Sequence, residues 1–575
     1  MLIANGVKVM AKKYRESADF RHVFWLTVIY ILAHWMILIS TGRWWDDWVY
    51  ADHNAEYVME AFKQSSLPLA GVVNIIIWYI PYKLFVFVMF YAGGILLYRI
   101  LQQIDFFSDD AVFWISALFL IIPINDARIL YICFNYSLGL FCYLLSFFLI
   151  TKWLRQSGKR RYFMRAFSLL ILLLAFNAES IMLMVVLMLL YMYYEDLKTD
   201  WNWREVRVNI RKLFYSVLHY MDFLLLPIAN YILTKIFFPA YGVYGGHSYI
   251  PWDSLADRVK NSPQYTWQTF KLIFSNWKDI VMDKPGQIVL FGTLMMCMII
   301  YYVSKSRGIP YFYEKSTLET DILYLLLGVL VFYLGIFPYI VKRGDSINVI
   351  YCAGRDALLL GIGTAMIIYY SLHLFVRGEL RRTVMVLLIV SGIIYFNNVY
   401  LVWEKSNYQQ LQIRDEMAVN QEIRDNNNFL VIYSGAVICS NHAQTNGNSW
   451  IATGEQTRHY VCGTRDLERL IEMRGDELYL NAYAMKDFDY TDKTIDGVIY
   501  VNYDHNFSGK GRGAILMQKW NEFFNKERFN QWIRELKEID YYAITPEQSD
   551  AIIEAYQNDE LTDENLIDYV LQTGW

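Results

Sequence analysis

The chain has 575 residues, of which 55% are hydrophobic, 17% aromatic and 19% charged, and its mean hydropathy is positive. Soluble proteins carry about 25% charged residues, so this composition excludes an ordinary soluble enzyme and a disordered scaffold. The formal net charge of −4, with no basic block, also argues against a nucleic-acid partner. A polytopic membrane protein remains.

Several stretches are apolar and close to the roughly 17–25 helical residues that a bilayer core requires. Residues 69–80 are apolar but short, and they end at Pro81, which favours a re-entrant or interfacial piece. The stretches that we expect to cross the membrane are residues 23–40, 82–101, 111–124, 129–150, 166–194, 213–238, 286–303, 318–341, 355–376 and 384–402.

Residues 166–194 are too long for one short span and are interrupted by a polar segment, residues 177–180. They form either one tilted helix or a hairpin of two short helices. Cytoplasmic loops are enriched in Lys and Arg, and only the hairpin places every basic connection on one side. We therefore predict 11 spans in an inner (cytoplasmic) membrane, with a cytoplasmic N-terminus and an extracytoplasmic C-terminus. The basic connections are residues 1–22, 151–165, 195–212, 304–317 and 377–382.

The charge divides the chain into two predicted domains. Residues 1–402 carry 36 Lys and Arg against 27 Asp and Glu, whereas residues 403–575 carry 16 against 29. We expect a polytopic α-helical transmembrane domain over 1–402 and an extracytoplasmic soluble α/β domain over 403–575, which binds an acceptor or caps the external cavity. After a polar helix over 403–428, the expected strands are 429–433, 437–439, 478–483 and 498–503, and the helices are 465–473, 514–526, 528–538 and 546–571.

Two adjacent carboxylates, Asp46 and Asp47, follow the first span in the segment RWWDDW. Carboxylates this close to the membrane are costly unless they meet a cation, a metal ion or a substrate hydroxyl. Tryptophans alone are typical of a membrane interface. The alternative role for either carboxylate is to cap the helix expected over 52–64.

An acidic pair at this place, after the first of many spans, resembles the membrane glycosyltransferases of the GT-C superfamily, which use polyprenyl-phosphate sugars as donors. The resemblance covers the architecture of residues 1–402, and RWWDDW is its one specific motif. It implies that Asp46 or Asp47 is the general base of an inverting sugar transfer. It also implies a glycan, lipid-linked saccharide or protein acceptor and, in some members, a divalent ion such as Mg²⁺ or Mn²⁺ on Asp46 and Asp47.

Three cations flank one short external loop, against the trend of the other loops: Lys342, Arg343 and Arg355. Guanidinium groups bind phosphate oxygens in a bidentate manner, so we prefer Arg343 and Arg355 as ligands of the lipid phosphate. In the alternative interpretation, Lys342 and Arg343 reach lipid headgroups and Arg355 pairs with Asp356 or Asp345.

Three further residues are candidates for substrate binding. Glu179 lies at the apex of the apolar hairpin, where it either orients a sugar hydroxyl, holds an arginine or caps the next helix. Tyr244 and His247 belong to a loop rich in Gly and Tyr, which suits either stacking on a sugar or an interfacial loop without a ligand. The scattered cysteines predict no zinc site, and a Cys439–Cys462 disulfide stays open.

Two other function classes are open on these residues. A carrier or flippase of a lipid-linked or hydrophilic substrate is the alternative, but it is expected to show internal repeats and ionisable groups at mid-membrane depth. A membrane scaffold is the third, and Asp46 and Asp47 would be dispensable for it. The external position of the charged residues favours the transferase.

Overall fold

A computed structural model gives the three-dimensional structure, and the chain forms two compact units. The helical unit comprises residues 1–39, 66–240 and 246–399, and the α/β unit comprises residues 40–65, 241–245 and 400–575. The structure describes residues 17–44, 47, 55–78, 81–198, 206–241, 252–306, 317–376, 378–421, 423, 428–434, 459–462, 497–502, 512–536, 539–562, 565 and 569.

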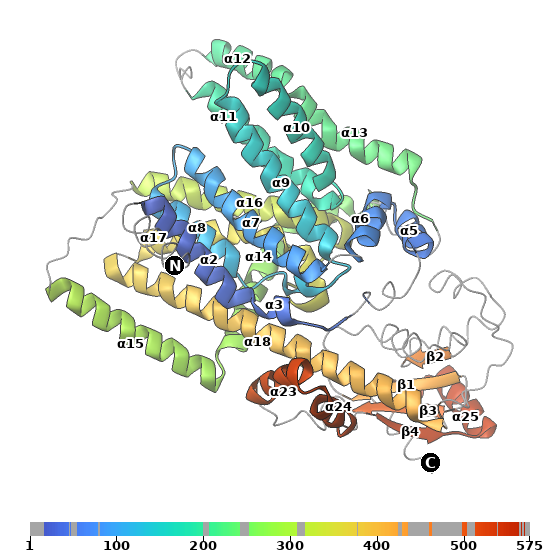
Figure 1. Ribbon diagram of the computed structural model, residues 1–575. Helices are drawn as coiled ribbons and strands as arrows, with labels where there is room; N and C mark the ends of the chain where they lie inside the picture. Colours follow the sequence, from blue (N-terminus) through green and yellow to red (C-terminus); the bar gives the residue numbers. More distant parts are fainter. Residues whose placement is uncertain are drawn as a thin grey trace, which may run out of the picture. The chain divides into compact units, whose positions relative to one another are not determined.

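The helical unit is built from long apolar helices (Figure 1). Their bounds are α2 (Ala18–His34), α3 (Met36–Ile39), α6 (Pro68–Trp78), α7 (Tyr82–Gln103), α8 (Asp109–Ile121), η1 (Asp126–Ile129), α9 (Phe134–Leu154), α10 (Lys159–Ala175), η2 (Glu179–Met184), α11 (Val185–Leu197), α12 (Val206–His219), α13 (Met221–Phe237), α14 (Trp252–Val281), α15 (Lys284–Ser306), α16 (Leu318–Arg343), η4 (Tyr351–Ala357), α17 (Leu360–Phe375) and α18 (Gly378–Val419).

The described helices confirm a multi-pass helical membrane protein. Six of them are long and apolar enough to cross a bilayer, and a seventh span is formed if α12 and α13, bent by 51° against each other, are counted together. The helices α6 and α17 are apolar but shorter. The predicted number of 11 spans therefore stays a prediction.

The apolar stretch over 166–194 is a hairpin, as the basic loops predict. The helix α10 ends at Ala175, and η2 with α11 continues after a turn at residues 176–178. Both ends of the hairpin return to one place: Lys198 after α11 lies 2.9 Å from Asp105, and Arg155 after α9 lies 3.4 Å from the same carboxylate. The basic segments 151–165 and 195–212 therefore begin at the same end of the helical unit.

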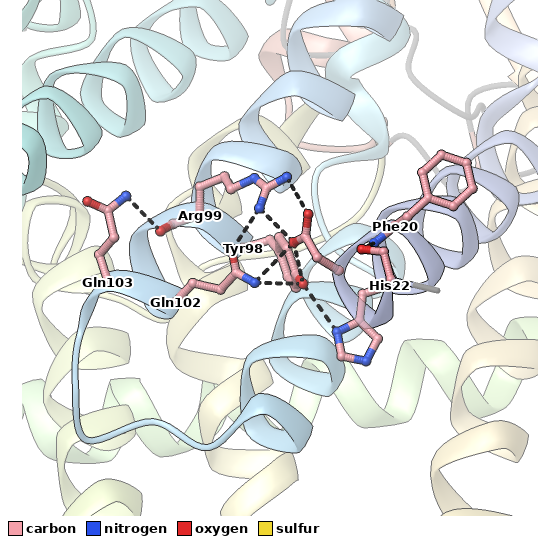
Figure 2. A network of polar contacts seen from close by, with 8 residues as sticks. Phe20, His22, Tyr98, Arg99, Gln102 and Gln103 are labelled. Carbon is pink, nitrogen blue, oxygen red and sulfur yellow. Dashed lines mark hydrogen bonds and ion pairs between the residues drawn. The ribbon is translucent and has the colours of Figure 1, made fainter. Parts of the chain in front are cut away.

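This end of the helical unit holds a network of ion pairs close to its surface (Figure 2). Arg99 and Gln102 of α7 donate to the carboxylate of Asp19 at the start of α2, with Arg99 Nη1 at 2.6 Å. The Tyr98 hydroxyl joins the network through Asp19 at 3.1 Å and His22 at 3.2 Å. The side chains of Arg99 and Asp19 are 37% and 44% exposed, so water screens this pair.

The helix α18 has 42 residues and crosses from one unit into the other. The sequence predicts a membrane span over 384–402 and a polar helix over 403–428 that leaves the membrane, and the structure joins the two in one continuous helix that ends at Val419. The sequence in this region contains neither Pro nor Gly after Gly392, and these are the residues that usually break a helix. The polar residues after 402 therefore continue the apolar helix without a break.

The α/β unit contains a four-stranded sheet with the order β2-β1-β3-β4. The strand β1 pairs in parallel with β2 and β3, and β4 runs antiparallel to β3. The bounds are α5 (Ala55–Gln64), β1 (Asn428–Ser434), β2 (His459–Cys462), β3 (Gly497–Asn502), α23 (Arg512–Phe524), α24 (Lys526–Arg534), β4 (Ile539–Ala543) and α25 (Pro546–Gln557).

The sequence predicted part of this sheet. The expected strands 429–433 and 498–503 correspond to β1 and β3, whereas β2 and β4 were missed. The helix expected over 546–571 ends at Gln557, and the one expected over 528–538 ends at Arg534. The predicted segments 437–439, 465–473 and 478–483 lie outside the described residues, as does the side chain of Cys439.

Candidate functional site

At the end of the helical unit opposite the basic loops, η1 and η4 pack against each other around a buried carboxylate. The two oxygens of Asp126 accept hydrogen bonds from the backbone N–H of Tyr351, at 2.9 and 3.1 Å. Asp126 is fully buried, and Tyr351 has a φ of 54°, which is unusual for a bulky residue. A Cβ on Gly354 would lie only 3.1 Å from Asp126 and 2.8 Å from the Val349 carbonyl oxygen. Asp126 therefore holds η4 in one conformation.

A buried arginine completes the η1 side of this contact. Arg128 is 1% exposed and donates to the backbone carbonyls of Asn125 at 2.7 Å and Ile124 at 2.8 Å. Its guanidinium lies 3.8 Å from the centre of the Phe90 ring, a cation–π contact. Two charged residues of one short turn are thus buried within the membrane protein.

The preferred phosphate ligands come together on the η4 side. Arg343, at the end of α16, forms an ion pair with Asp356, and Arg355 Nε lies 3.8 Å from the other oxygen of that carboxylate. Asp356 is 4% exposed, whereas Arg343 and Arg355 are 41% and 28% exposed. Two cations thus share one carboxylate, and both cations stay partly exposed.

The end of α16, which carries Lys342 and Arg343, is fixed by a glycine and by an arginine of α14. Gly344 ends α16 in the left-handed region with a φ of 75°, and Arg258 of α14 donates to the last carbonyls of the helix, those of Val341 and Lys342, at 3.0 and 2.6 Å. Lys342 itself is exposed at this helix end. The alternative for Arg355, a pair with Asp356, is present, and Arg343 shares that partner.

The other sequence candidate in the helical unit is also paired. Glu179, at the start of η2, lies 3.3 Å from Lys235 of α13, and the two side chains are 38% and 24% exposed. The next residue, Ser180, accepts a hydrogen bond from Tyr339 of α16 at 2.9 Å. The apex of the hairpin is therefore attached to α16, the helix that carries Arg343, while Glu179 still reaches water.

The first-loop carboxylates belong to the α/β unit. Asp47 is fully buried, its backbone N–H donates to the Trp44 carbonyl at 3.1 Å, and its side chain lies 3.4 Å from the Trp44 N–H. The indole of Trp44 donates to the carbonyl of Trp403 in α18 at 2.9 Å. Asp46, Tyr244 and His247 lie outside the described residues. A neighbour of that loop, Tyr241, donates to Glu60 of α5, which raises the pKa of Tyr241 to about 12.

Asp126 and Arg128 are not among the site residues that the sequence predicts, although both are buried in the structure. The available signal was Pro123 followed closely by two charges inside an apolar region. Within the part of the chain that the structure describes, no three His, Cys, Asp or Glu side chains gather to hold a metal ion. Asp46 lies outside that part. The binding of a metal ion by Asp46 and Asp47 therefore remains a prediction.

Comparisons with known proteins give matches in structure. No protein-family description matches the sequence, and no curated protein matches it. Among solved structures, the chain is similar to the archaeal oligosaccharyltransferase AglB from Archaeoglobus fulgidus, in complex with an inhibitory peptide and a dolichol-phosphate. The identity is 10%, the TM-score is 0.37, and the match covers 85% of this chain and 70% of that one.

It is also similar to ArnT from Cupriavidus metallidurans bound to undecaprenyl phosphate, with 10% identity, a TM-score of 0.32 and coverage of 84% of this chain and 93% of that one. The first of these proteins was solved with a dolichol-phosphate and the second with undecaprenyl phosphate. At these TM-scores neither match assigns an activity to this chain.

Proposed function

We propose that the chain is an inverting membrane glycosyltransferase of the GT-C type that transfers a sugar from a polyprenyl phosphate to a glycan, lipid-linked saccharide or protein on the outer side of the inner membrane. The observation that carries the proposal is the pair Arg343 and Arg355 around the single buried carboxylate of Asp356. Two guanidinium groups side by side suit a lipid phosphate, whose oxygens accept bidentate hydrogen bonds. The carboxylates of the acidic motif RWWDDW supply the general base of the reaction.

In the proposed reaction, the hydroxyl oxygen of the acceptor attacks the anomeric carbon of the donor. Asp46 or Asp47 accepts the proton of that hydroxyl as the new bond forms. The bond between that carbon and the phosphate oxygen breaks, and the anomeric configuration inverts. A carboxylate in a partly desolvated site is a stronger base than one in water. Burial of Asp47 next to Trp44 supports such a role for this loop.

The leaving group is a polyprenyl phosphate, which departs as an anion and needs no strong acid. Cations have to stabilise the negative charge that develops on its oxygen. We assign this task to Arg343 and Arg355, with Lys342 at the exposed helix end as a further contact. Glu179, Tyr244 and His247 stay candidates for contacts with the sugar or the acceptor.

Separate variants of the acidic pair, Asp46→Asn and Asp47→Asn, test the proposal. The purified full chain in detergent receives radiolabelled undecaprenyl-phosphate hexoses and pentoses with a membrane extract as acceptor, and the release of undecaprenyl phosphate is measured. We expect at least one variant to lose 100-fold or more of the transfer rate, in the range of a missing general base. Glu56→Gln is the control, because Glu56 is an exposed carboxylate of the same loop region.

Wild-type rates in both variants would contradict the assignment of the base. Repeating the assay with a chelator, and then with Mg²⁺ or Mn²⁺ added back, shows whether a divalent ion takes part. Release that stops with the chelator and returns with metal places an ion in the reaction, and release that continues assigns the charge stabilisation to the arginines.

A further inference from the structure

A buried lysine of the α/β unit connects α23 to the segment that precedes the acidic pair. Lys519 of α23 is 3% exposed, and its ammonium group donates to Glu404 of α18 at 2.8 Å, to Glu522 at 2.8 Å and to the hydroxyl of Thr41 at 3.1 Å. These three acceptors match the three N–H groups that an ammonium offers. The Thr41 hydroxyl in turn donates to Glu522.

The described residues from Thr41 to Trp44 are also held by close packing. A Cβ on Gly42 would lie 2.3 Å from the Trp44 ring and 2.8 Å from Asn407 of α18, so only glycine fits there. Trp44 is fully buried, and its ring meets that of Trp403 edge-on, with centroids 5.2 Å apart. The segment is therefore fixed on α18 at Trp44 and on α23 at Thr41.

The charges of this cluster make the lysine necessary. One ammonium faces two carboxylates, of which Glu404 is 2% and Glu522 is 15% exposed in its side chain. Removal of one partner of a buried ion pair leaves an uncompensated charge, which is far more costly than the loss of a surface pair. The Tyr408 hydroxyl gives Glu522 an additional hydrogen bond at 3.2 Å. Without the ammonium group, Glu522 and Glu404 would repel each other beside Thr41.

We infer that Lys519 is a positioning residue, which holds the acidic segment of the first external loop in its reactive place through Thr41. The inference rests on the proposed function, because it assumes that Asp46 or Asp47 acts on the acceptor. It assigns the C-terminal domain a part in the reaction: α23 fixes the approach to the acidic pair, in addition to any cap over the site. A shift of about 1 Å in a catalytic group is enough to slow a reaction 100-fold.

The variants Thr41→Val and Lys519→Met test the inference in the full chain. Thr41→Val keeps the shape of the side chain and removes the hydroxyl. We expect kcat to fall at least tenfold for Thr41→Val and about 100-fold for Lys519→Met, with the KM for an undecaprenyl-phosphate sugar changed less than threefold. Thr41→Ser restores the hydroxyl and is expected to restore kcat, and Lys526→Met is the control at the exposed start of α24.

Hydrogen–deuterium exchange of residues 41–47 gives a readout that needs no activity. We expect faster exchange of this segment in Thr41→Val and Lys519→Met, while α9 and α16 exchange as in the wild type. Unchanged exchange, or a kcat for Thr41→Val equal to that of the wild type, would overturn the inference. A kcat that falls only in proportion to the loss of folded protein would overturn it as well. Faster exchange in a chain whose Asp46→Asn and Asp47→Asn variants transfer normally would instead refute the proposed base.

Discussion

The two ends of the helical unit use the same types of charged residue in opposite ways. At the end of the basic loops, Arg99 and Asp19 are 37% and 44% exposed, and Asp105 is 63% exposed. At the η1–η4 end, Asp126 and Arg128 are at most 1% exposed. Exposed pairs contribute about 0–1 kcal/mol each, so the first end needs no function beyond orientation in the membrane. Buried charges at the second end are too costly to be retained for that purpose alone.

The two ends also differ in how their cations share carboxylates. At the basic-loop end, each described aspartate of the network already has partners: Asp105 meets Arg155 and Lys198, and Asp19 meets Arg99. At the other end, Arg343 and Arg355 share one carboxylate and stay partly exposed. The second arrangement therefore differs from the first in that two guanidinium groups meet at one buried carboxylate.

The largest expected effect is the loss of these guanidinium groups. Replacing both arginines, Arg343→Met with Arg355→Met, removes the charge that meets the leaving phosphate, and we expect the transfer rate to fall 100- to 1,000-fold. Binding of undecaprenyl phosphate alone, measured by native mass spectrometry, is expected to weaken in parallel. Arg99→Met is the matched control at the opposite end and is expected to leave both quantities within twofold. Equal losses in the control and the double variant would show that the two ends do not differ.

The second effect concerns stability. Asp126→Asn keeps the size of the side chain but replaces one of the two oxygens that accept from Tyr351 N–H with a donor. We expect a loss of about 1–3 kcal/mol in the free energy of unfolding, the cost of a buried polar group left without a suitable partner. Thermal unfolding in detergent measures it, with Asp345→Asn as the exposed control. A change below 0.5 kcal/mol would mean that Asp126 does not hold η4.

These two clusters show what a sequence can predict. The hairpin over 166–194 followed from counting Lys and Arg by loop, because charge asymmetry across a membrane is a property of composition. Arg343 and Arg355 are predicted as phosphate ligands because few charges occur near these ends of the spans, and that role stays a prediction. Their shared partner Asp356 was expected only for Arg355, since the pairing of α16 with η4 depends on tertiary packing.

The α/β unit shows where such reasoning ends. The strands β1 and β3 are apolar runs with β-branched residues and were predicted from that pattern. The sequence of β4, IDYYA, carries one charge and follows a helix closely, so its pairing with β3 decides its conformation. Likewise, Lys519 is one of many lysines in an acidic domain, and its burial against Thr41 joins residues 478 positions apart.

A smaller effect is expected at the apex of the hairpin. Glu179→Gln removes the charge that faces Lys235 but keeps the shape of the side chain, and this pair is partly exposed. We expect a stability change within 1 kcal/mol and a three- to tenfold rise in the KM for the sugar donor if Glu179 orients the sugar. Lys235→Met separates the two roles, because it breaks the same pair without removing the carboxylate. Equal kinetics in both variants would reduce Glu179 to a partner of Lys235.

The smallest effect is a pH dependence at the basic-loop end. The hydrogen bond from Lys198 lowers the pKa of Asp105 below its ordinary value. A carboxyl with a lowered pKa in the folded state stabilises the protein above the pKa of the unfolded chain, near 4, and this stabilisation is lost as the pH falls through the folded pKa. Wild type should therefore unfold at a slightly higher temperature than Asp105→Asn at pH 7, and the difference should shrink as the pH falls below the ordinary pKa of an aspartate. Because Asp105 is largely exposed, high salt should shrink the difference in unfolding temperature at pH 7. A difference that does not depend on salt would show that Asp105 behaves as a buried charge, as Asp126 does at the other end.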